Sequence, residues 1–186
     1  APPGQIKALV SDLADAVWAQ GERFGTIGAQ INGKTYEITT HRAEVYADSS
    51  RKPVVEFGTD IRADLERRDF TVNAMAIDLH ERVLMDPFGG CADLAANVLR
   101  TPMAPDVSFS DDPLRMLRAA RFHAGYDLIP EPAMLEAIES MGERMAIVSA
   151  ERIRDELQKL LLLSHAAMGI RLLTETCLLA HVVPTL

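Results

Sequence analysis

The stretch from Arg67 to Met75 concentrates polar groups that suit a bound polyphosphate. Its polar members are Arg67, Arg68, Asp69, Thr71 and Asn73. Arginine forks match phosphate oxygens bidentately and stay charged at any working pH, and an Asn or Asp can bind the hydroxyls of a ribose. The same residues also suit a helix end, where two arginines lie beside the negative C-terminal dipole of residues 60–66. A nucleotide pocket and a purely structural role are both open at this point.

A second cluster lies in residues 111–122, where Asp112 and Arg115 are three residues apart and can share one side of a helical turn. Together they offer acceptors and donors, which can form hydrogen bonds to the Watson–Crick edge of a base. Asp112 followed by Pro113 is also typical of a helix start, and Arg115 with Arg118 can simply pair with acids. The spacing alone leaves both interpretations open.

The sequence lacks the motifs of several other common catalytic mechanisms. The five histidines show no metal-ligand spacing, and neither a nucleophile elbow nor a Walker-type phosphate loop is present. Metal-assisted nucleotidyl transfer needs convergent carboxylates, which an Asp-x-Asp on a strand supplies. The chain contains no Asp-x-Asp, and Asp64 and Glu66 project about 200° apart on a helix, so they cannot share a metal.

Composition predicts a globular chain of one domain or two small ones, with 186 residues of which 48% are hydrophobic. The formal net charge of -8 means that a nucleic-acid partner must be held by a local basic patch. Two cysteines give no disulfide framework, which favours a reducing cytoplasm. The apolar run Leu160–Leu163 is far too short to span a membrane, and no signal peptide is evident. We therefore expect a soluble, cytoplasmic protein with no membrane partner.

The N-terminal part is predicted as one helix followed by a β-hairpin. Apolar residues recur at helical spacing over residues 4–19, with Asp12 and Asp15 on the polar side. Segments 23–31 and 34–40 flank Asn32-Gly33, a strong hairpin turn. Glu37 lies on the second strand, on a face that is either solvated or functional. Residues 44–53 are predicted as a polar loop.

The middle of the chain is predicted as a helix, two strands and a turn. Thr59 is a candidate N-cap for a helix that ends at Arg67 or Arg68. Residues 74–79 and 83–85 are typical of short strands, 86–90 of a glycine turn and 92–96 of a helical turn. A Pro-containing break places an internal boundary near residues 101–109.

Beyond that boundary the pattern predicts helices alone. They are expected from Asp112 to about Ala124, from Pro130 and Pro132 through Ile138, from Ser149 to Leu163 and as a pair over 166–182. In the third of these helices the predicted buried residues are Ile153, Leu157, Leu160 and Leu161.

Three segments together, 67–75, Asp86-Pro87-Phe88-Gly89-Gly90 and 112–122, closely resemble the bacterial class II tRNA nucleotidyltransferase (CCA-adding enzyme) and poly(A) polymerase family, in order and in spacing. Residues 36–42 and 149–154 also look like family segments, so the resemblance covers nearly the whole chain. It implies an α+β fold: an incomplete mixed-sheet nucleotidyltransferase head of the polymerase β-like type over residues 1–105. An all-helical neck and body, which selects the nucleobase and binds RNA, would follow over 106–186.

The resemblance also implies an activity. Family members add CMP and AMP from CTP and ATP to the 3′ end of tRNA without a template and release pyrophosphate, by a two-metal mechanism that uses Mg²⁺. Some relatives add only A or a poly(A) tail. By resemblance Arg67, Arg68, Asp69 and Asn73 would contact the ribose and triphosphate, Asp112 and Arg115 would select the base, and Arg118 and Arg121 would lie near the nucleotide.

Glu37 would be the supporting catalytic carboxylate. One departure concerns the metal ligands, because the Asp-x-Asp strand of the family is not in this sequence. We therefore expect this chain alone to bind nucleotide poorly and to catalyse little. The alternative to the enzyme is a non-catalytic nucleotide- or RNA-binding module.

Overall fold

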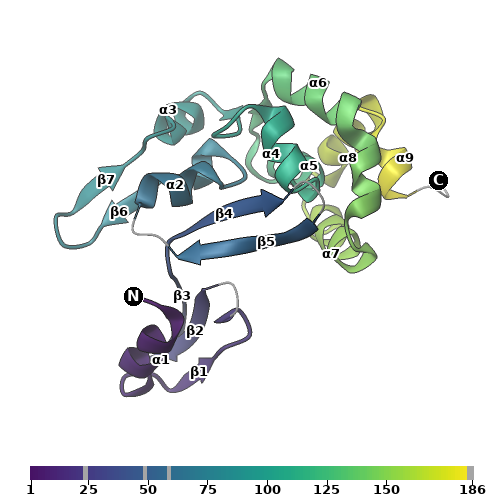
Figure 1. The fold of residues 1–186 in the computed structure, drawn as a ribbon. Helices are drawn as coiled ribbons and strands as arrows, with labels where there is room; N and C mark the ends of the chain where they lie inside the picture. Colours follow the sequence, from purple (N-terminus) through teal and green to yellow (C-terminus); the bar gives the residue numbers. More distant parts are fainter. Residues whose placement is uncertain (23–24, 48–49, 58–59, 184–186) are drawn as a thin grey trace. The chain divides into compact units, whose positions relative to one another are not determined.

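A computed structural model describes residues 1–22, 25–47, 50–57 and 60–183, and it divides the chain into two compact units, Ala1–Asp64 and Leu65–Leu186. The first unit holds α1 (Pro3–Ser11), β1 (Ala16–Trp18), β2 (Thr26–Ile31), β3 (Lys34–Thr39), β4 (Arg42–Ala47) and β5 (Ser50–Phe57). Helix α2 (Ile61–Glu66) spans the division between the units (Figure 1).

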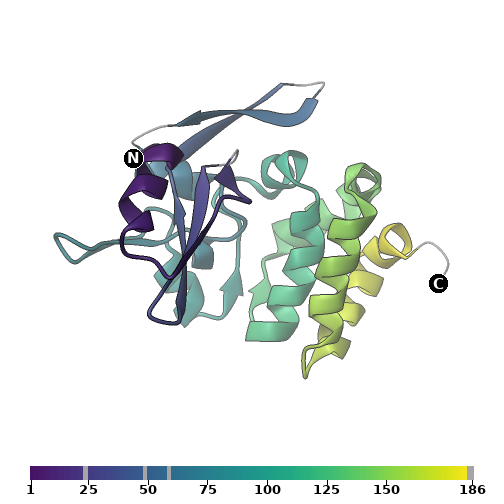
Figure 2. The ribbon, with the colours of Figure 1, turned by 90° about the horizontal axis from the view of Figure 1, so that it is seen from below.

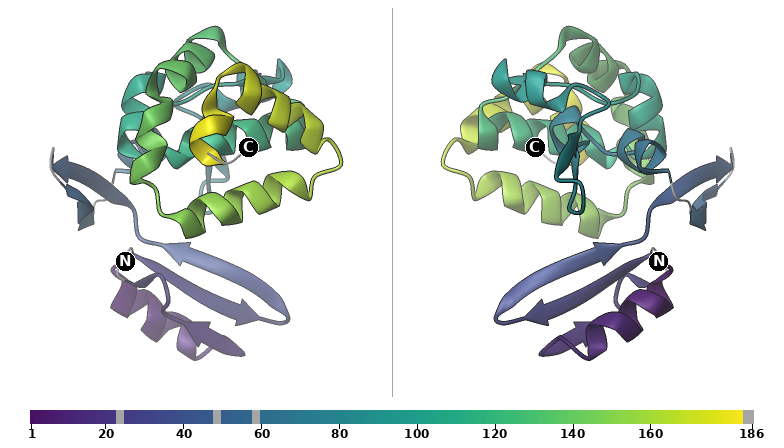
Figure 3. Two further views of the ribbon diagram at one scale, coloured as in Figure 1. Left: turned by 90° about the vertical axis from the view of Figure 1, so that its right-hand side faces the viewer. Right: turned by 90° about the vertical axis from the view of Figure 1, so that its left-hand side faces the viewer.

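In the first unit, β1, β2 and β3 form an antiparallel sheet in that order. Helix α1 lies along one side of this sheet, and a small core forms between them from Ile6, Val10, Ile27 and Ala29 (Figure 3). The predicted hairpin is confirmed, with Asn32 and Gly33 at φ values of 51° and 75° as a type I′ turn requires.

The predicted helix over residues 4–19 is wrong in its second half. The amides of Leu13 and Ala14 both donate to the Val10 carbonyl and close the helix. The amide of Asp15 then donates to Gln30 O at 2.7 Å, which starts the pairing of β1 with β2. Sheet hydrogen bonds thus outweigh the continuing apolar period, and Leu13 stays 70% exposed.

The predicted polar loop over residues 44–53 is also wrong. Strands β4 and β5 pair antiparallel there, with Val45 opposite Val54 and an irregularity between Val45 and Ala47. Backbone pairing determines the extended conformation of this segment, since the strand propensity of its β-branched residues outweighs its polar composition. Thr59, the predicted N-cap, lies outside the described residues. The Arg62 amide donates to the side chain of Asp60 at 2.9 Å.

The second unit begins with short elements and ends with helices. Its short elements are η2 (Thr71–Asn73), β6 (Ala76–Asp78), β7 (Val83–Met85), α3 (Gly90–Ala95) and β8 (Val98–Leu99). Its remaining elements are α4 (Pro105–Asp111), α5 (Leu114–Tyr126), β9 (Ile129–Pro130), α6 (Pro132–Met141), η3 (Gly142–Ile147), α7 (Ala150–Leu161), α8 (Ala166–Glu175) and α9 (Leu178–Val182). The predicted strands at 74–79 and 83–85 and the predicted C-terminal helices are confirmed, with ends that differ by at most three residues.

Helix α5 is the central element of this unit. Helices α7 and α8 both pack on it, and the three run side by side in Figure 2. Phe70 and Leu99, which precede the helices in sequence, share one core with them. The division between compact units lies between residues 64 and 65, and Phe70 and Leu99 pack with the helices beyond it. The functional boundary near residue 105 stays a prediction.

Three smaller differences concern single segments. Residues 105–111 form α4 where the sequence indicated only a break, since Pro105 suits a first helical turn and Phe109 is fully buried. The helical half also contains β9, which pairs parallel with β8. Leu161 was expected to be buried but is 56% exposed, whereas its neighbour Leu160 is fully buried.

Gly169 sets the distance between α8 and α5. A Cβ atom there would lie 2.5 Å from Leu160 Cδ1 and 2.7 Å from Ala120 O, both too close. We expect Gly169→Ala to lower the free energy of unfolding by about 2 kcal/mol, because a backbone oxygen of α5 has to move. Urea denaturation measures this, and Gly125→Ala is the control because only the flexible tip of Leu163 faces it at 3.3 Å. Equal stability of the two variants would contradict the expectation.

No helix among the described residues is both long enough and apolar enough to cross a lipid bilayer.

Candidate nucleotide site

Asp69 joins the first candidate segment to α5. Its Oδ1 accepts hydrogen bonds from the Phe70 amide at 2.9 Å and from Asn73 Nδ2 at 3.0 Å. Its Oδ2 accepts from Arg118 Nε at 3.0 Å and Nη2 at 2.5 Å. The extended residue Phe70 and the turn η2 place Asn73 beside the carboxylate. Asp69 thus connects two sequence segments that lie 49 residues apart.

The pKa of Asp69 reflects these contacts. Burial by itself raises the pKa, but the Arg118 charge and the hydrogen bonds from Asn73, Arg118 and the Phe70 amide outweigh burial and lower the pKa below 3.8. A carboxyl whose pKa is lower in the folded state contributes stability above its unfolded pKa and loses it as the pH falls through the folded pKa.

We therefore expect Asp69→Asn to change the pH dependence of stability as well as its level. At pH 7 the variant should be less stable than the wild type, because Arg118 loses one of its two charged partners. Below about pH 4 the difference should begin to shrink, since the carboxyl of the unfolded chain is protonated there first and the folded wild-type carboxyl, whose pKa is lower, follows as the pH falls further. Urea unfolding of both proteins at pH 7, 5 and 3 checks this, and a difference that is constant with pH would contradict it.

Arg115 is largely buried, with 8% of its surface exposed. Its Nη1 donates to Ser108 Oγ at 2.8 Å and to Ser108 O at 3.2 Å, and its Nη2 donates to Arg67 O at 2.5 Å. Arg115 therefore ties α5 both to α4 and to the backbone of the 67–75 segment. A guanidinium has five N–H donors, so these bonds leave Nε and one Nη2 hydrogen for a further acceptor.

Asp112 precedes α5 and contacts α7. Its Oδ2 accepts from Arg152 Nη2 at 2.7 Å, and its Oδ1 accepts from the Leu114 amide at 3.3 Å. The predicted helix-start role is thus present alongside an ion pair that the sequence did not indicate. Asp112 lies two residues before α5 and Arg115 lies in the first turn of that helix, and the Arg115 amide donates to the Asp112 carbonyl.

Arg118 and Arg121 converge on one buried acid, Glu156 of α7. The Arg121 Nε donates to Glu156 Oε1, and Arg118 Nη1 lies 3.7 Å from Glu156 Oε2. The Glu156 side chain is 3% exposed, and Lys159 approaches the same oxygen at 3.7 Å. A chain of charges therefore runs from Asp69 through Arg118 to Glu156 and Arg121.

Glu156 was not predicted from the sequence, although the sequence contains a signal for it. Glu156 follows Ile153 by three residues and precedes Leu160 by four, so it falls on the apolar stripe of α7. A charged residue on a buried stripe requires a partner inside the fold. Arg152 and Ser108, which hold Asp112 and Arg115, carry no comparable signal in the sequence.

An aromatic contact extends the site along α5. Phe70 and Phe122 pack with ring centroids 5.0 Å apart, and the Arg121 guanidinium lies 4.8 Å above the Phe122 ring. Beside them lies a cavity of about 240 Å³, which Asn73 and Tyr126 help to line. Polar and aromatic groups of both candidate segments thus meet at one surface of the second unit.

Arg67 and Arg68 sit where α2 leads into this site. The Arg67 side chain is half-buried and that of Arg68 is exposed. The turn at 86–90 supports the same region, because Asp86 accepts hydrogen bonds from the amides of Gly90 at 2.7 Å and Cys91 at 2.9 Å and so caps α3. The bond from the Cys91 amide is the main reason why the pKa of Asp86 is lowered.

Close packing between α3 and the 67–75 segment requires a glycine at position 90. A Cβ atom on Gly90 would lie 2.2 Å from Thr71 O, so only a glycine lets α3 approach the 67–75 segment. The Thr71 hydroxyl also donates to Asp93 of α3 at 2.7 Å. The glycine turn therefore supports the site by packing.

Glu37 belongs to the first unit, where it is exposed on β3 opposite Gly28 of β2. Among the described residues no three His, Cys, Asp or Glu side chains gather closely enough to hold a metal ion. The described residues therefore do not form a two-metal centre by themselves.

Comparison with known proteins gives a consistent result. The family model described as the poly A polymerase head domain matches residues 1–100, and the one described as a probable RNA and SrmB-binding site of polymerase A matches residues 127–186. The CCA-adding enzyme of Lactobacillus helveticus is 36% identical over 94% of this chain and 43% of its own length. That of Bacillus velezensis is 37% identical over 96% of this chain and 44% of its own length.

Solved structures agree with these matches. The Bacillus stearothermophilus CCA-adding enzyme in complex with CTP has a TM-score of 0.85 at 34% identity, over 97% of this chain and 42% of that one. The Thermotoga maritima CCA-adding enzyme complexed with tRNA has a TM-score of 0.76 at 29% identity, over 99% of this chain and 42% of that one. The chain thus spans less than half the length of the relatives it matches.

Proposed function

We propose that this chain, which belongs to the poly(A) polymerase head-domain family of nucleotidyltransferases, forms part of a template-independent RNA nucleotidyltransferase. Its α+β fold agrees with that family. The enzyme would add CMP and AMP from CTP and ATP to the 3′ end of tRNA and release pyrophosphate. The names of the curated relatives support CCA addition as the product.

One observation carries the proposal: the two predicted nucleotide-binding segments meet in space through the ion pair of Asp69 and Arg118. Four arginines, Arg67, Arg115, Arg118 and Arg121, lie at or beside this junction. Such a local concentration of guanidinium groups is what an acidic chain needs to attract a triphosphate.

The residues of the 67–75 segment would bind the sugar and the phosphates of the nucleotide. Arg67 and Arg68 would bind the triphosphate, and Asn73 would use its Oδ1 for the ribose, because its Nδ2 already donates to Asp69. Asp69 would orient Asn73 and Arg118, since contacts in the second unit occupy both of its oxygens.

The nucleobase would be selected by Asp112 and by the Arg115 donors that Ser108 and Arg67 leave unused. Arg118 and Arg121 would balance the negative charge nearby. A bidentate contact of this kind discriminates between bases by about 1–3 kcal/mol, enough to prefer C or A over the others.

Mg²⁺ remains part of the proposal for the intact protein, with Glu37 as a supporting carboxylate. Such ions would supply Lewis-acid stabilisation of the negative charge on the phosphates. The similarity to CCA-adding enzymes, on which the proposed activity rests, also leads us to propose a cytoplasmic location and a tRNA partner.

The test uses the protein from its complete reading frame, with Mg²⁺ and labelled nucleotides. CTP and ATP incorporation is compared on tRNA that ends before CCA and on tRNA that already ends with CC. CMP addition to the first and AMP addition to the second support CCA addition. AMP addition alone indicates an A-adding enzyme, a long A tail indicates a poly(A) polymerase, and no incorporation with retained nucleotide binding indicates a non-catalytic module.

A further inference from the structure

A cavity of about 580 Å³ lies in the second unit, outside the nucleotide site. Its walls come from β9, α6 and α8, with His123 of α5 at its side. This volume is within the range of about 300–1,000 Å³ that small-molecule sites occupy in proteins. None of its lining residues belongs to the candidate nucleotide-binding set.

The interior of the cavity is apolar. Its apolar lining residues are Ile129, Pro130, Leu135, Ala167, Met168 and Leu172. An aliphatic chain placed there would leave water and gain about 25 cal/mol for each Å² it buries. A ligand with a hydrocarbon body therefore suits these walls.

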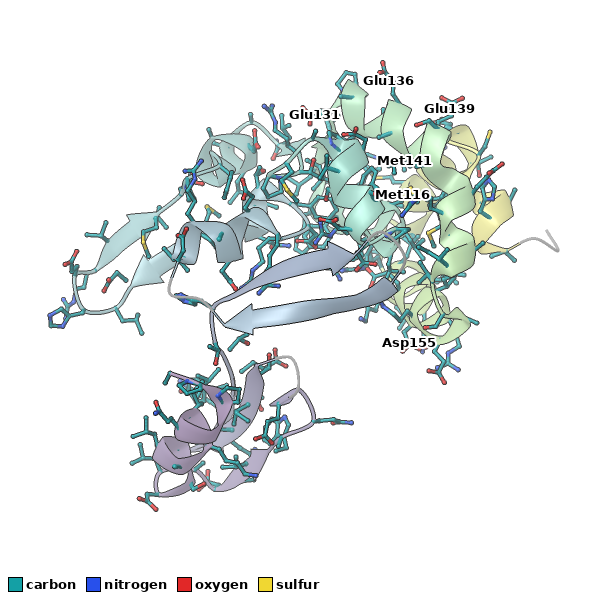
Figure 4. All side chains as sticks on the ribbon, in the orientation of Figure 1. Met116, Glu131, Glu136, Glu139, Met141 and Asp155 are labelled. Atoms are coloured by element: carbon teal, nitrogen blue, oxygen red, sulfur yellow. The ribbon has the colours of Figure 1, made fainter. Side chains whose placement is uncertain are left out.

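The polar groups around the cavity are mostly acceptors. Glu136 and Glu139 project from α6, at the upper edge of the view in Figure 4, and Glu175 comes from α8. None of these three carboxylates makes a hydrogen bond or ion pair within the part of the chain that the structure describes, and all are exposed. Arg171 is the cation of the lining, so the carboxylates leave a local excess of negative charge.

His123 adds a further acceptor. Its Nδ1 lies 2.8 Å from Leu128 O, a carbonyl that can only accept, so the neutral ring carries its proton on Nδ1. The Nε2 atom is then the acceptor of the ring. A ligand that satisfies this lining must bring several N–H donors and positive charge, and phosphate groups are disfavoured.

We propose that this cavity binds an aliphatic polyamine. The methylene chain would lie on the apolar walls, and the ammonium groups would pair with Glu139, Glu175 and Glu136. This site is independent of the proposed transferase activity, since it shares no residue with the nucleotide site.

The test measures binding of hexane-1,6-diamine and spermidine to the whole chain by calorimetry at low ionic strength. Hexane-1,6-diol serves as the neutral counterpart of the first probe. In parallel, the NMR signal of a ¹³C-labelled Met168 methyl group reports on the cavity, and that of Met85 on β7 reports on a distant surface. We expect saturable binding of both amines, a shift of the Met168 signal alone, and no binding of the diol.

Two variants separate the charge from the cavity. Glu139→Gln combined with Glu175→Gln should weaken amine binding about tenfold, whereas Glu81→Gln on the exposed β6–β7 turn should leave it unchanged. Ala167→Phe should fill the cavity without a change in charge and also weaken binding. The proposal is overturned if no saturable binding occurs up to about 10 mM, if the diol binds equally well, or if either cavity variant binds like the wild type.

Discussion

Replacing Arg115 by alanine is expected to reduce kcat/KM for CMP and AMP incorporation about 100-fold, measured with the protein from its complete reading frame. Arg115 holds Ser108 on one side and the Arg67 carbonyl on the other, and it carries the unused donors proposed for the base. The substitution thus removes a base contact and loosens the position of the triphosphate-binding segment at once.

Two further variants separate these effects. Arg115→Lys keeps the charge but loses the planar fork, so it should restore stability more than incorporation. Ser108→Ala removes one hydrogen bond that positions Arg115 and should reduce incorporation far less than Arg115→Ala does. Arg171→Ala, on the exposed surface of α8, is the matched control and should act like the wild type.

The opposite outcome has a definite meaning. If Arg115→Ala binds CTP and ATP as the wild type does but loses about 1–3 kcal/mol of stability, then Arg115 is a structural ion partner and not a nucleotide ligand. Fluorescence titration with each nucleotide and urea denaturation of the same preparation give the two numbers.

The second large effect concerns stability. Glu156→Ala should lower the free energy of unfolding by about 3 kcal/mol, because it leaves Arg118 and Arg121 without their shared carboxylate in a largely buried place. Urea denaturation at pH 7 measures the loss. Glu151→Ala, which removes an exposed acid from the same helix, should cost less than about 1 kcal/mol.

A double-mutant cycle tests whether the effect comes from this contact. Combining Glu156→Ala with Arg121→Ala should cost less than the sum of the two single changes, since the second change removes the charge that the first one left unpaired. Additive costs would instead mean that Glu156 stabilises α7 by a route that does not involve Arg121.

Some parts of the fold follow from short-range patterns. Asn32-Gly33 predicted its turn because few residue pairs adopt positive φ twice in succession, and Ser149 predicted the start of α7 because its side chain accepts the Arg152 amide at 3.5 Å. The two strands around residues 80–82 and the helical end of the chain were predicted for similar reasons. Each of these signals acts within about four residues.

Segments whose structure depends on a distant partner were not predicted. Residues 16–18 became a strand because β2 offered unpaired backbone groups, and residues 44–47 and 50–53 formed paired strands although their composition is that of a loop. Helix α4 formed where only a proline break was apparent, because the core accommodates Phe109. Propensity yields to tertiary hydrogen bonds and burial in such places.

For the candidate site, the sequence alone identified the residue types and both segments, 67–75 and 112–122. It could not determine which charge pairs with which, because an arginine on a helix can reach any acid that packing brings near. The tertiary structure decided that Arg118 pairs with Asp69 and that Arg121 pairs with Glu156. Packing of α7 and the 67–75 segment against α5 places these acids beside α5, and burial makes each pairing obligatory since an unpaired buried charge is costly.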